Sequence, residues 1–181
     1  MAFNINQFKS ELQYGGARPT LFQCEITNPP GINLGNGVEK FPFMARAAGI
    51  PESQVGQYIV PYFGRQVKYA GDRIFADWTV TIINDEDFAV RNSIEKWLDF
   101  INSHDSNTRA LPQNYKTDGI IKQYAKGGDQ PIRVYRFEGM FPIAADAIQM
   151  GWDQVDQIEE FNVTFQYDLW RVEGNESDIT T

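Results

Sequence analysis

Residues 69–85 read Tyr69-Ala-Gly-Asp-Arg-Ile-Phe-Ala-Asp-Trp-Thr-Val-Thr-Ile-Ile-Asn-Asp85, and this stretch decides the fold. We interpret it as a turn, then a strand, then the first residues of a helix. Between residues 74 and 83 the side chains alternate with the period of a half-buried strand. One face holds Ile74, Ala76, Trp78, Val80 and Ile82. Asn84 and Asp85 follow with side chains that commonly cap helices.

A single long amphipathic helix is predicted to follow, from about Asp85 to Asn102. Apolar side chains recur along it with helical spacing, in a stripe wide enough to face a core. The stripe consists of Val90, Ile94, Trp97, Leu98 and Ile101. Charged residues take the opposite face, and the acidic residues 85–87 favour the positive end of the helix dipole.

Extended segments on both sides of this helix predict a sheet of seven or eight strands. The other strand candidates are residues 20–27, 38–48, 57–63, 65–69, 120–126, 132–138 and 158–170. Pro42 is expected to weaken the second of these or to place it at an edge or bulge. A long polar loop is expected over residues 102–119. The sequence therefore predicts a mainly β fold with one α-helix, an antiparallel β-barrel or sandwich flanked by that helix.

The chain is organised as one domain with short extensions at both ends. A length of 181 residues with 42% hydrophobic residues suits a single globular core, which we place at residues 18–170. Residues 1–17 form a predicted N-terminal arm, with Ile5, Phe8 and Leu12 on one helical face. This face packs either on the chain's own barrel or on a neighbouring subunit. Residues 171–181 are a polar C-terminal tail.

Composition restricts which compartment the protein is expected to occupy and which partners it is expected to bind. The N-terminus has neither the charged nor the apolar region of a signal peptide, and no run approaches the length of a membrane span. The net charge of −8 disfavours a general nucleic-acid binder, although it suits a surface that repels nucleic acid. The one cysteine, Cys24, lies in an alternating run and is expected to be a core thiol in a reducing compartment.

Residues that carry chemistry do not assemble into any recognisable pattern, so we expect no catalytic, metal or cofactor site. His104 is the only histidine and lies in the polar loop. Glu159 and Glu160 are neighbours on a predicted strand, where their side chains point to opposite faces. The aspartates of residues 146–156 lack the spacing of a calcium loop. The chain is therefore not expected to be an enzyme.

The central stretch resembles the signature of the tail tube proteins of contractile-tailed bacteriophages, which are related to tailocin and type VI secretion tube proteins. The residues that carry the resemblance are Gly71, Asp72, Arg73, Asp77, Trp78, Asn84 and Asp85. Weaker similarity, in the same order along the chain, lies in residues 17–26, 123–125, 139–142 and 152–170.

The resemblance implies a structural virion protein that forms sixfold rings, stacked into a tube inside a contractile sheath. It implies sheath, baseplate and tail-terminator proteins as partners, no membrane, and DNA that passes through the lumen without sequence-specific binding. It places the protein in the virion tail, assembled in the host cytoplasm. Ring closure agrees with the physics of edge strands, which are an aggregation hazard until they are paired.

Two groups of residues are candidates for contacts in such an assembly. Exposed apolar content in the arm and in turn-rich sequence gives the candidate subunit interface: Phe3, Ile5, Phe8, Leu12, Phe43, Met44, Val55, Tyr58, Ile59 and Tyr62. The polar side of the last strand gives the candidate lumen face: Glu160, Asn162, Thr164, Gln166 and Asp168. An ordinary solvated sheet face explains the polar stripe equally well.

Two alternative functions stay open. One is the tube of a phage-derived contractile injection system, such as a tailocin or secretion tube, with the same fold. The other is a small monomeric β-barrel that binds a ligand, which would require a hollow apolar pocket.

Overall fold

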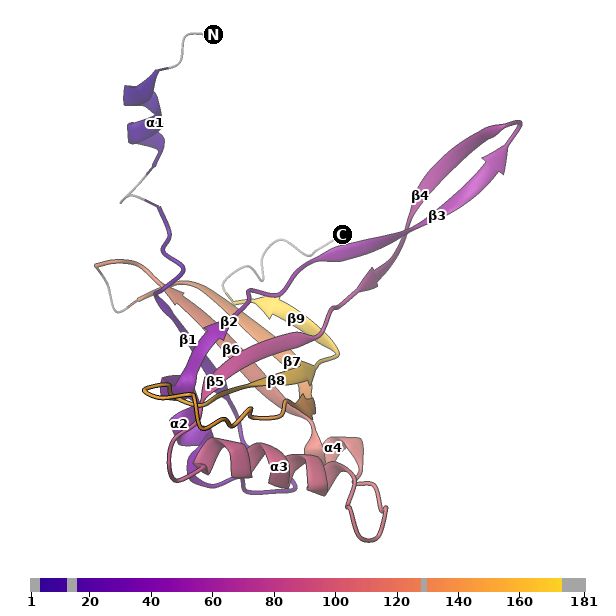
Figure 1. Cartoon of the computed structure of the whole chain (residues 1–181). Coiled ribbons are helices and arrows are strands. Elements are labelled where there is room, and N and C mark those ends of the chain that lie inside the picture. The colour runs from indigo at the N-terminus through magenta and orange to yellow at the C-terminus, as the bar shows by residue number, and fades with distance from the viewer. Residues whose placement is uncertain (1–3, 13–15, 128–129, 174–181) are drawn as a thin grey trace.

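The computed structural model describes residues 4–12, 16–127 and 130–173. Its elements in chain order are α1 (Ile5–Glu11), β1 (Phe22–Ile26), α2 (Asn36–Met44), β2 (Ala45–Ala48), β3 (Gln54–Tyr62), β4 (Arg65–Ile74), β5 (Trp78–Ile83), α3 (Ala89–Ile101), α4 (Pro112–Tyr115), β6 (Thr117–Tyr124), β7 (Pro131–Ala145), β8 (Glu160–Gln166) and β9 (Leu169–Val172). Figure 1 shows a strand-rich body, a projecting hairpin formed by β3 and β4, and α1 standing apart from the body. The helices among these residues are too short or too polar to cross a membrane.

The body is a seven-stranded antiparallel sheet with the order β1-β6-β7-β8-β5-β2, in which β9 also pairs with β7. The sheet curls, so that β1 and β2, at opposite ends of the order, approach within 8 Å between Cα atoms. Strands β8 and β9 pair with successive parts of the long strand β7. The predicted mainly β, antiparallel fold class is confirmed.

Aromatic and branched side chains fill the space between the curled sheet, α2 and α3. On β5, Trp78, Val80 and Ile82 are buried, as the alternation predicted. The Trp78 ring stacks on Phe137 with 4.6 Å between ring centroids, and Phe165 lies beside it at 5.5 Å. The interior is therefore packed with side chains.

The helix α3 covers one flank of the sheet, and its stripe is confirmed by the burial of Val90, Ile94 and Trp97. Its predicted start was wrong, because the helix begins at Ala89 rather than at Asp85. The residues expected to cap it bind elsewhere: Asn84 donates to Glu159, and Asp85 pairs with Lys40. Phe88 instead occupies the N-cap position with a left-handed backbone.

The predicted strand over residues 38–48 was wrong, because most of it is the helix α2. Gly37, Phe41 and Met44 fall on the face that packs inward, at a helical spacing of four and three residues. A Cβ atom at Gly37 would overlap the Ser93 side chain, so glycine lets α2 approach α3 closely. Pro42 misdirected the prediction, since it lies near the end of this helix.

Three other boundaries differ from the predictions. The strand expected over residues 74–83 is two strands, since β4 ends at Ile74 and β5 begins at Trp78. The strand expected over residues 158–170 is likewise divided into β8 and β9, which continues to Val172. The expected loop over residues 102–119 contains the short helix α4 and ends where β6 begins at Thr117.

Cys24 is a core thiol, as predicted. Its side chain has no exposed surface, and burial raises the pKa of the thiol to about 12. The neutral thiol is therefore the stable form at physiological pH, and this cysteine has little nucleophilic character.

Trp97 offers a test of the packing of α3. We predict that Trp97→Ala lowers the free energy of unfolding by about 3–5 kcal/mol, the range for truncating a buried Trp. The variant loses its contact with Phe165 and its indole hydrogen bond to the Tyr115 carbonyl. Urea unfolding of the monomer measures the change. Asn92→Ala, on the exposed side of the same helix, should change stability by less than about 0.5 kcal/mol.

Candidate assembly surfaces

The hairpin of β3 and β4 forms a two-stranded sheet of its own, separate from the body (Figure 1). Every residue of the two strands is exposed except Gly56 and Gly71. Many of the exposed side chains are large and apolar: Val55, Tyr58, Ile59, Val60, Tyr62, Val67, Tyr69 and Ile74. A two-stranded hairpin is marginally stable alone, so this apolar surface indicates a contact with another molecule.

The strand register divides the hairpin into two faces. Tyr58 lies opposite Tyr69, Val60 opposite Val67 and Tyr62 opposite Arg65, and cross-strand partners share a face. The Tyr58 and Tyr69 rings stack with 5.3 Å between centroids. We call Tyr58, Val60, Tyr62, Val67 and Tyr69 the aromatic face. Lys68, opposite Ile59, lies on the other face.

Residues 70–73 were predicted to be a turn, and this was wrong because they lie within β4. The register between β3 and β4 shifts between Val55 and Gln57, which marks a β-bulge on β4, where Gly71 and Asp72 together lie opposite Gly56. A Cβ atom at Gly71 would lie 3.2 Å from the Gly56 carbonyl carbon. A Cβ atom at Gly56 would lie 3.2 Å from the backbone carbonyl oxygen of Asp72. The glycines thus allow the two backbones to approach closely at the bulge.

The motif residues therefore fall on two parts of the molecule. Gly71, Asp72 and Arg73 belong to the bulge of the hairpin, while Trp78 is in the core. Asp77 is exposed beside the start of β5. The described residues hold no group of three or more His, Cys, Asp or Glu side chains placed to bind a metal.

The N-terminal helix α1 exposes its apolar side. Ile5, Phe8 and Leu12 are each about half exposed, and α1 buries no residue. Asn4 caps the helix through its side-chain oxygen. Phe3, also proposed for the interface, lies outside the described residues. Within the described part of the chain, the arm therefore does not use its apolar face to pack on its own barrel.

The polar side of β8 forms a hydrogen-bonded stripe outside the core. Asn162 accepts a hydrogen bond from Thr81 at 2.8 Å, and the Thr164 and Thr79 hydroxyls lie 3.4 Å apart. Glu160 forms an ion pair with Arg46 on β2. Gln166 ends the strand and is exposed. Asp168 comes after the end of β8 and binds Lys116 at 2.7 Å, so it departs from this stripe.

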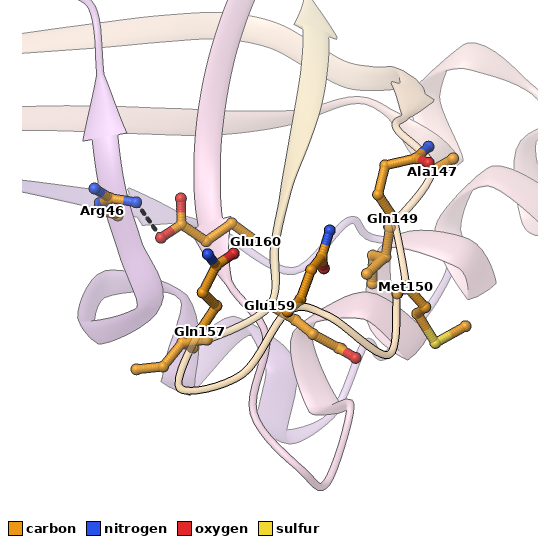
Figure 2. Close-up of a pocket in the computed structure, with 11 residues that line it drawn as sticks. Arg46, Ala147, Gln149, Met150, Gln157, Glu159 and Glu160 are labelled. Atoms are coloured by element: carbon orange, nitrogen blue, oxygen red, sulfur yellow. Dashed lines mark hydrogen bonds and ion pairs between the residues drawn. The ribbon is translucent and has the colours of Figure 1, made fainter.

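The segment between β7 and β8, residues 146–159, is an exposed surface that the sequence did not predict. With Arg46 and Glu160 it borders a depression of about 690 Å³, where Gln149, Met150 and Gln157 extend along its rim (Figure 2). Four of its side chains are large, apolar and exposed: Met150, Trp152, Val155 and Ile158. Their spacing matches neither the period of a helix nor that of a strand, so the sequence pattern did not predict that they would form an exposed surface.

Two charged sites stabilise the turns around α3. The hydrogen bond that Lys40 donates to Asp87 lowers the pKa of that carboxyl group. The hydrogen bonds that Lys40 donates to Asp87 and Asp85 raise the pKa of Lys40. Hydrogen bonds from the backbone and ring of His104 lower the pKa of Asp99. These two ion pairs, Lys40 with Asp87 and His104 with Asp99, therefore support loop structure.

The sequence is similar to known tail tube proteins. A family model described as phage tail tube protein matches residues 17–173. The chain is 33% identical over 155 residues to the tail tube protein gp19 of Enterobacteria phage T4, covering 85% of this chain and 90% of that protein. It is 24% identical over 166 residues to the tail tube protein of Serratia phage KSP90, covering 90% of this chain and 93% of that protein.

Solved structures of contractile systems share the fold. The tube-terminating cap of the anti-feeding prophage has a TM-score of 0.62 at 14% identity, covering 87% of this chain and 90% of that chain. The sheath–tube complex of the extracellular contractile injection system PVC has a TM-score of 0.57 at 13% identity, covering 95% and 99%.

Gly71 tests the role of the bulge. We predict that Gly71→Val pushes β3 and β4 apart and exposes the hairpin to proteolysis, while the body stays folded. Limited proteolysis, with cleavage sites mapped by mass spectrometry, should show faster cutting within residues 54–74. Tryptophan fluorescence in urea should give an unchanged unfolding midpoint. Ala70→Val, next to it on β4 and exposed, is the matched control. Equal cutting in both variants would contradict the steric role of Gly71.

Proposed function

The chain belongs to the phage tail tube protein family, and from this membership we propose that it forms sixfold rings. In this proposal the rings stack into a tail tube whose lumen conducts phage DNA during ejection. The family points to a structural rather than a catalytic protein. The protein acts in the virion tail after assembly in the host cytoplasm.

The observation that carries this proposal is the projecting β3–β4 hairpin. Its strands expose apolar side chains along their whole length, which a monomer leaves in water. Burial of apolar surface contributes roughly 25 cal/mol per Å², so covering the hairpin favours association. A hairpin that reaches beyond its own body suits contact with another subunit.

The ends of the sheet supply a second reason for ring formation. β1 pairs with β6 and β2 pairs with β5, and each of these two end strands has one partner in the sheet. Unpaired strand edges are templates for further pairing. A head-to-tail contact that closes on itself gives a ring, and stacking of rings without closure gives a filament.

The polar stripe on β8 suits the wall of a DNA channel. Thr and Asn side chains bond to one another across β5 and β8, and Arg46, a cation beside the stripe, is paired with Glu160. A wall that is neutral to negative does not retain DNA, because phosphates find no free cations there. Under this proposal Glu160, Asn162, Thr164 and Gln166 line the lumen, and Asp168 lies at its margin.

The proposed partners are the sheath, baseplate and tail-terminator proteins. Support comes from the solved structures that share the fold, which include a sheath–tube complex, a sheath/tube terminator and a baseplate. Those structures also keep a second candidate open, the tube of a contractile injection system. A monomeric ligand-binding barrel is not favoured, because side chains such as Trp97, Phe137 and Phe165 fill the interior.

Purified protein should assemble without any cofactor. We predict rings and tubes in negative-stain micrographs and a rise in light scattering with concentration, after long incubation to allow nucleation. Pairing of edges and burial of the hairpin provide the driving force. A protein that stays a monomer of 20.7 kDa at every concentration and salt tested would contradict the proposed function.

Deleting residues 2–14 should block stacking and leave the domain folded. The deletion removes Ile5, Phe8 and Leu12, whose apolar side chains are exposed on α1 and support no core. Urea unfolding should therefore be unchanged, while tubes should be replaced by rings or monomers. The matched control replaces exposed polar residues of the same helix, Gln7→Ala with Lys9→Ala, and should assemble normally. Tubes from the truncated protein as readily as from the full chain would refute a role for the arm.

A further inference from the structure

We propose that the turn at Tyr167 and the strand β9 form a clasp that sets the direction of the hairpin, and that opening this clasp lets the hairpin swing on its two linkers. The first linker, residues 49–53, joins β2 to β3, and the second linker, residues 75–77, joins β4 to β5. The clasp is a property of the single subunit, so it goes beyond the proposed function and does not depend on it.

The two linkers lack the backbone hydrogen bonds that hold the strands on either side of them. Within the described part of the chain, no backbone hydrogen bond joins residues 49–53 or 75–77 to the body. Two indole groups donate to the first linker instead: Trp78 to the Gly49 carbonyl at 3.0 Å, and Trp170 to the Glu52 carbonyl at 3.2 Å. Segments with few hydrogen bonds move at a low cost in free energy. The direction of the hairpin therefore depends on the side chains that contact its linkers.

Both linkers are contacted from the corner between β8 and β9. Trp170 on β9 binds the first linker at Glu52, while Tyr167 packs against Phe75 of the second linker with 6.0 Å between ring centroids. Burial raises the pKa of Tyr167, and so do the negative charges of Glu52 and Asp77, which lie one on each linker. Figure 1 shows β9, in yellow, at the end of the body from which the hairpin departs. One corner of the sheet therefore holds both linkers.

The strand β9 is short and has a single partner among the described strands. Its four residues pair with β7 alone. Two ion pairs connect the two strands from partly exposed positions, Arg171 with Glu138 and Arg136 with Glu173. A short strand at the edge of a sheet opens at a lower free energy than the strands of the core. The clasp can therefore open while the body stays folded.

Open space next to the second linker allows the hairpin to swing. Ala76, Asp77 and Tyr167 line two depressions, of about 330 Å³ and about 280 Å³. The linkers meet at the first strand pair of the hairpin, Gln54 opposite Ile74, so bending at the linkers moves the hairpin as one unit. Strands of nine and ten residues are about 30 Å long, so a swing of about 30° moves the tip by about 15 Å.

Time-resolved FRET on the monomer tests the clasp. Gln66→Cys near the tip of the hairpin and Asn92→Cys on α3 supply two exposed label sites, and Cys24 stays unlabelled because it is fully buried. In this background, Trp170→Phe keeps an aromatic ring but cannot donate to Glu52. The distribution of distances between the labels should become about twice as wide, because the hairpin then samples further directions. Nanomolar protein concentrations keep association low during the measurement.

Trp152→Phe is the matched control, because Trp152 is fully exposed on the segment between β7 and β8. Its distance distribution should be as narrow as that of the labelled chain without it. A second variant combines Glu138→Gln with Glu173→Gln, which removes both ion pairs of β9 and leaves the linkers unchanged. It should also widen the distribution, although it removes no packed side chain. Urea unfolding checks that the body of each variant is folded.

Distributions as narrow as the control in both clasp variants would overturn the clasp and leave the proposed function standing. Equal widening by Trp170→Phe and Trp152→Phe would overturn the clasp as well. The measurement uses single subunits, so a failure of the chain to form tubes, which contradicts the proposed function, does not change its result.

Discussion

The position of the hairpin depends on the burial of Trp78. Its ring packs between Phe137 and Phe165 in the core, and its indole N–H donates to the Gly49 carbonyl at 3.0 Å. Gly49 precedes β3 and Trp78 follows β4, so this hydrogen bond joins the two ends of the segment that forms the hairpin. Trp170 on β9 adds a second indole bond, to the Glu52 carbonyl at 3.2 Å. Two large side chains therefore hold the entry to the hairpin in place and tie its direction to the core.

The residues that stabilise the fold are different from those proposed for subunit contacts. The body contains the buried residues and the stacked aromatic rings, whereas the hairpin and α1 contribute almost nothing to the core. Exposed apolar surface is normally a liability in a monomer. A net charge of −8 opposes indiscriminate association, because molecules of like charge repel one another.

Sequence patterns predicted the parts of the fold that are set by burial on one face. Trp78, Val80 and Ile82 alternate with exposed neighbours, and Val90, Ile94 and Trp97 repeat with helical period, so both elements were found. The helix α2 was missed because Pro42 was read as an edge-strand signal, although Gly37, Phe41 and Met44 have helical spacing. Propensity rules of this kind are weak where tertiary packing decides the outcome.

The same reasoning explains why the hairpin was only half predicted. Its strands were recognised as extended, but exposure on both faces leaves no alternation of burial that would show where the chain departs from the body. Gly71 suggested a turn because glycine is common in both turns and β-bulges. Only the position of Gly71 opposite Gly56 on the neighbouring strand shows that it belongs to a bulge. The bulge increases the local twist of the ribbon, and therefore decides which way the aromatic face points beyond it. The central motif thus links a core residue, Trp78, to a bulge on the projecting hairpin: Trp78 fixes where the hairpin leaves the body, and the bulge fixes the direction of the strands beyond it.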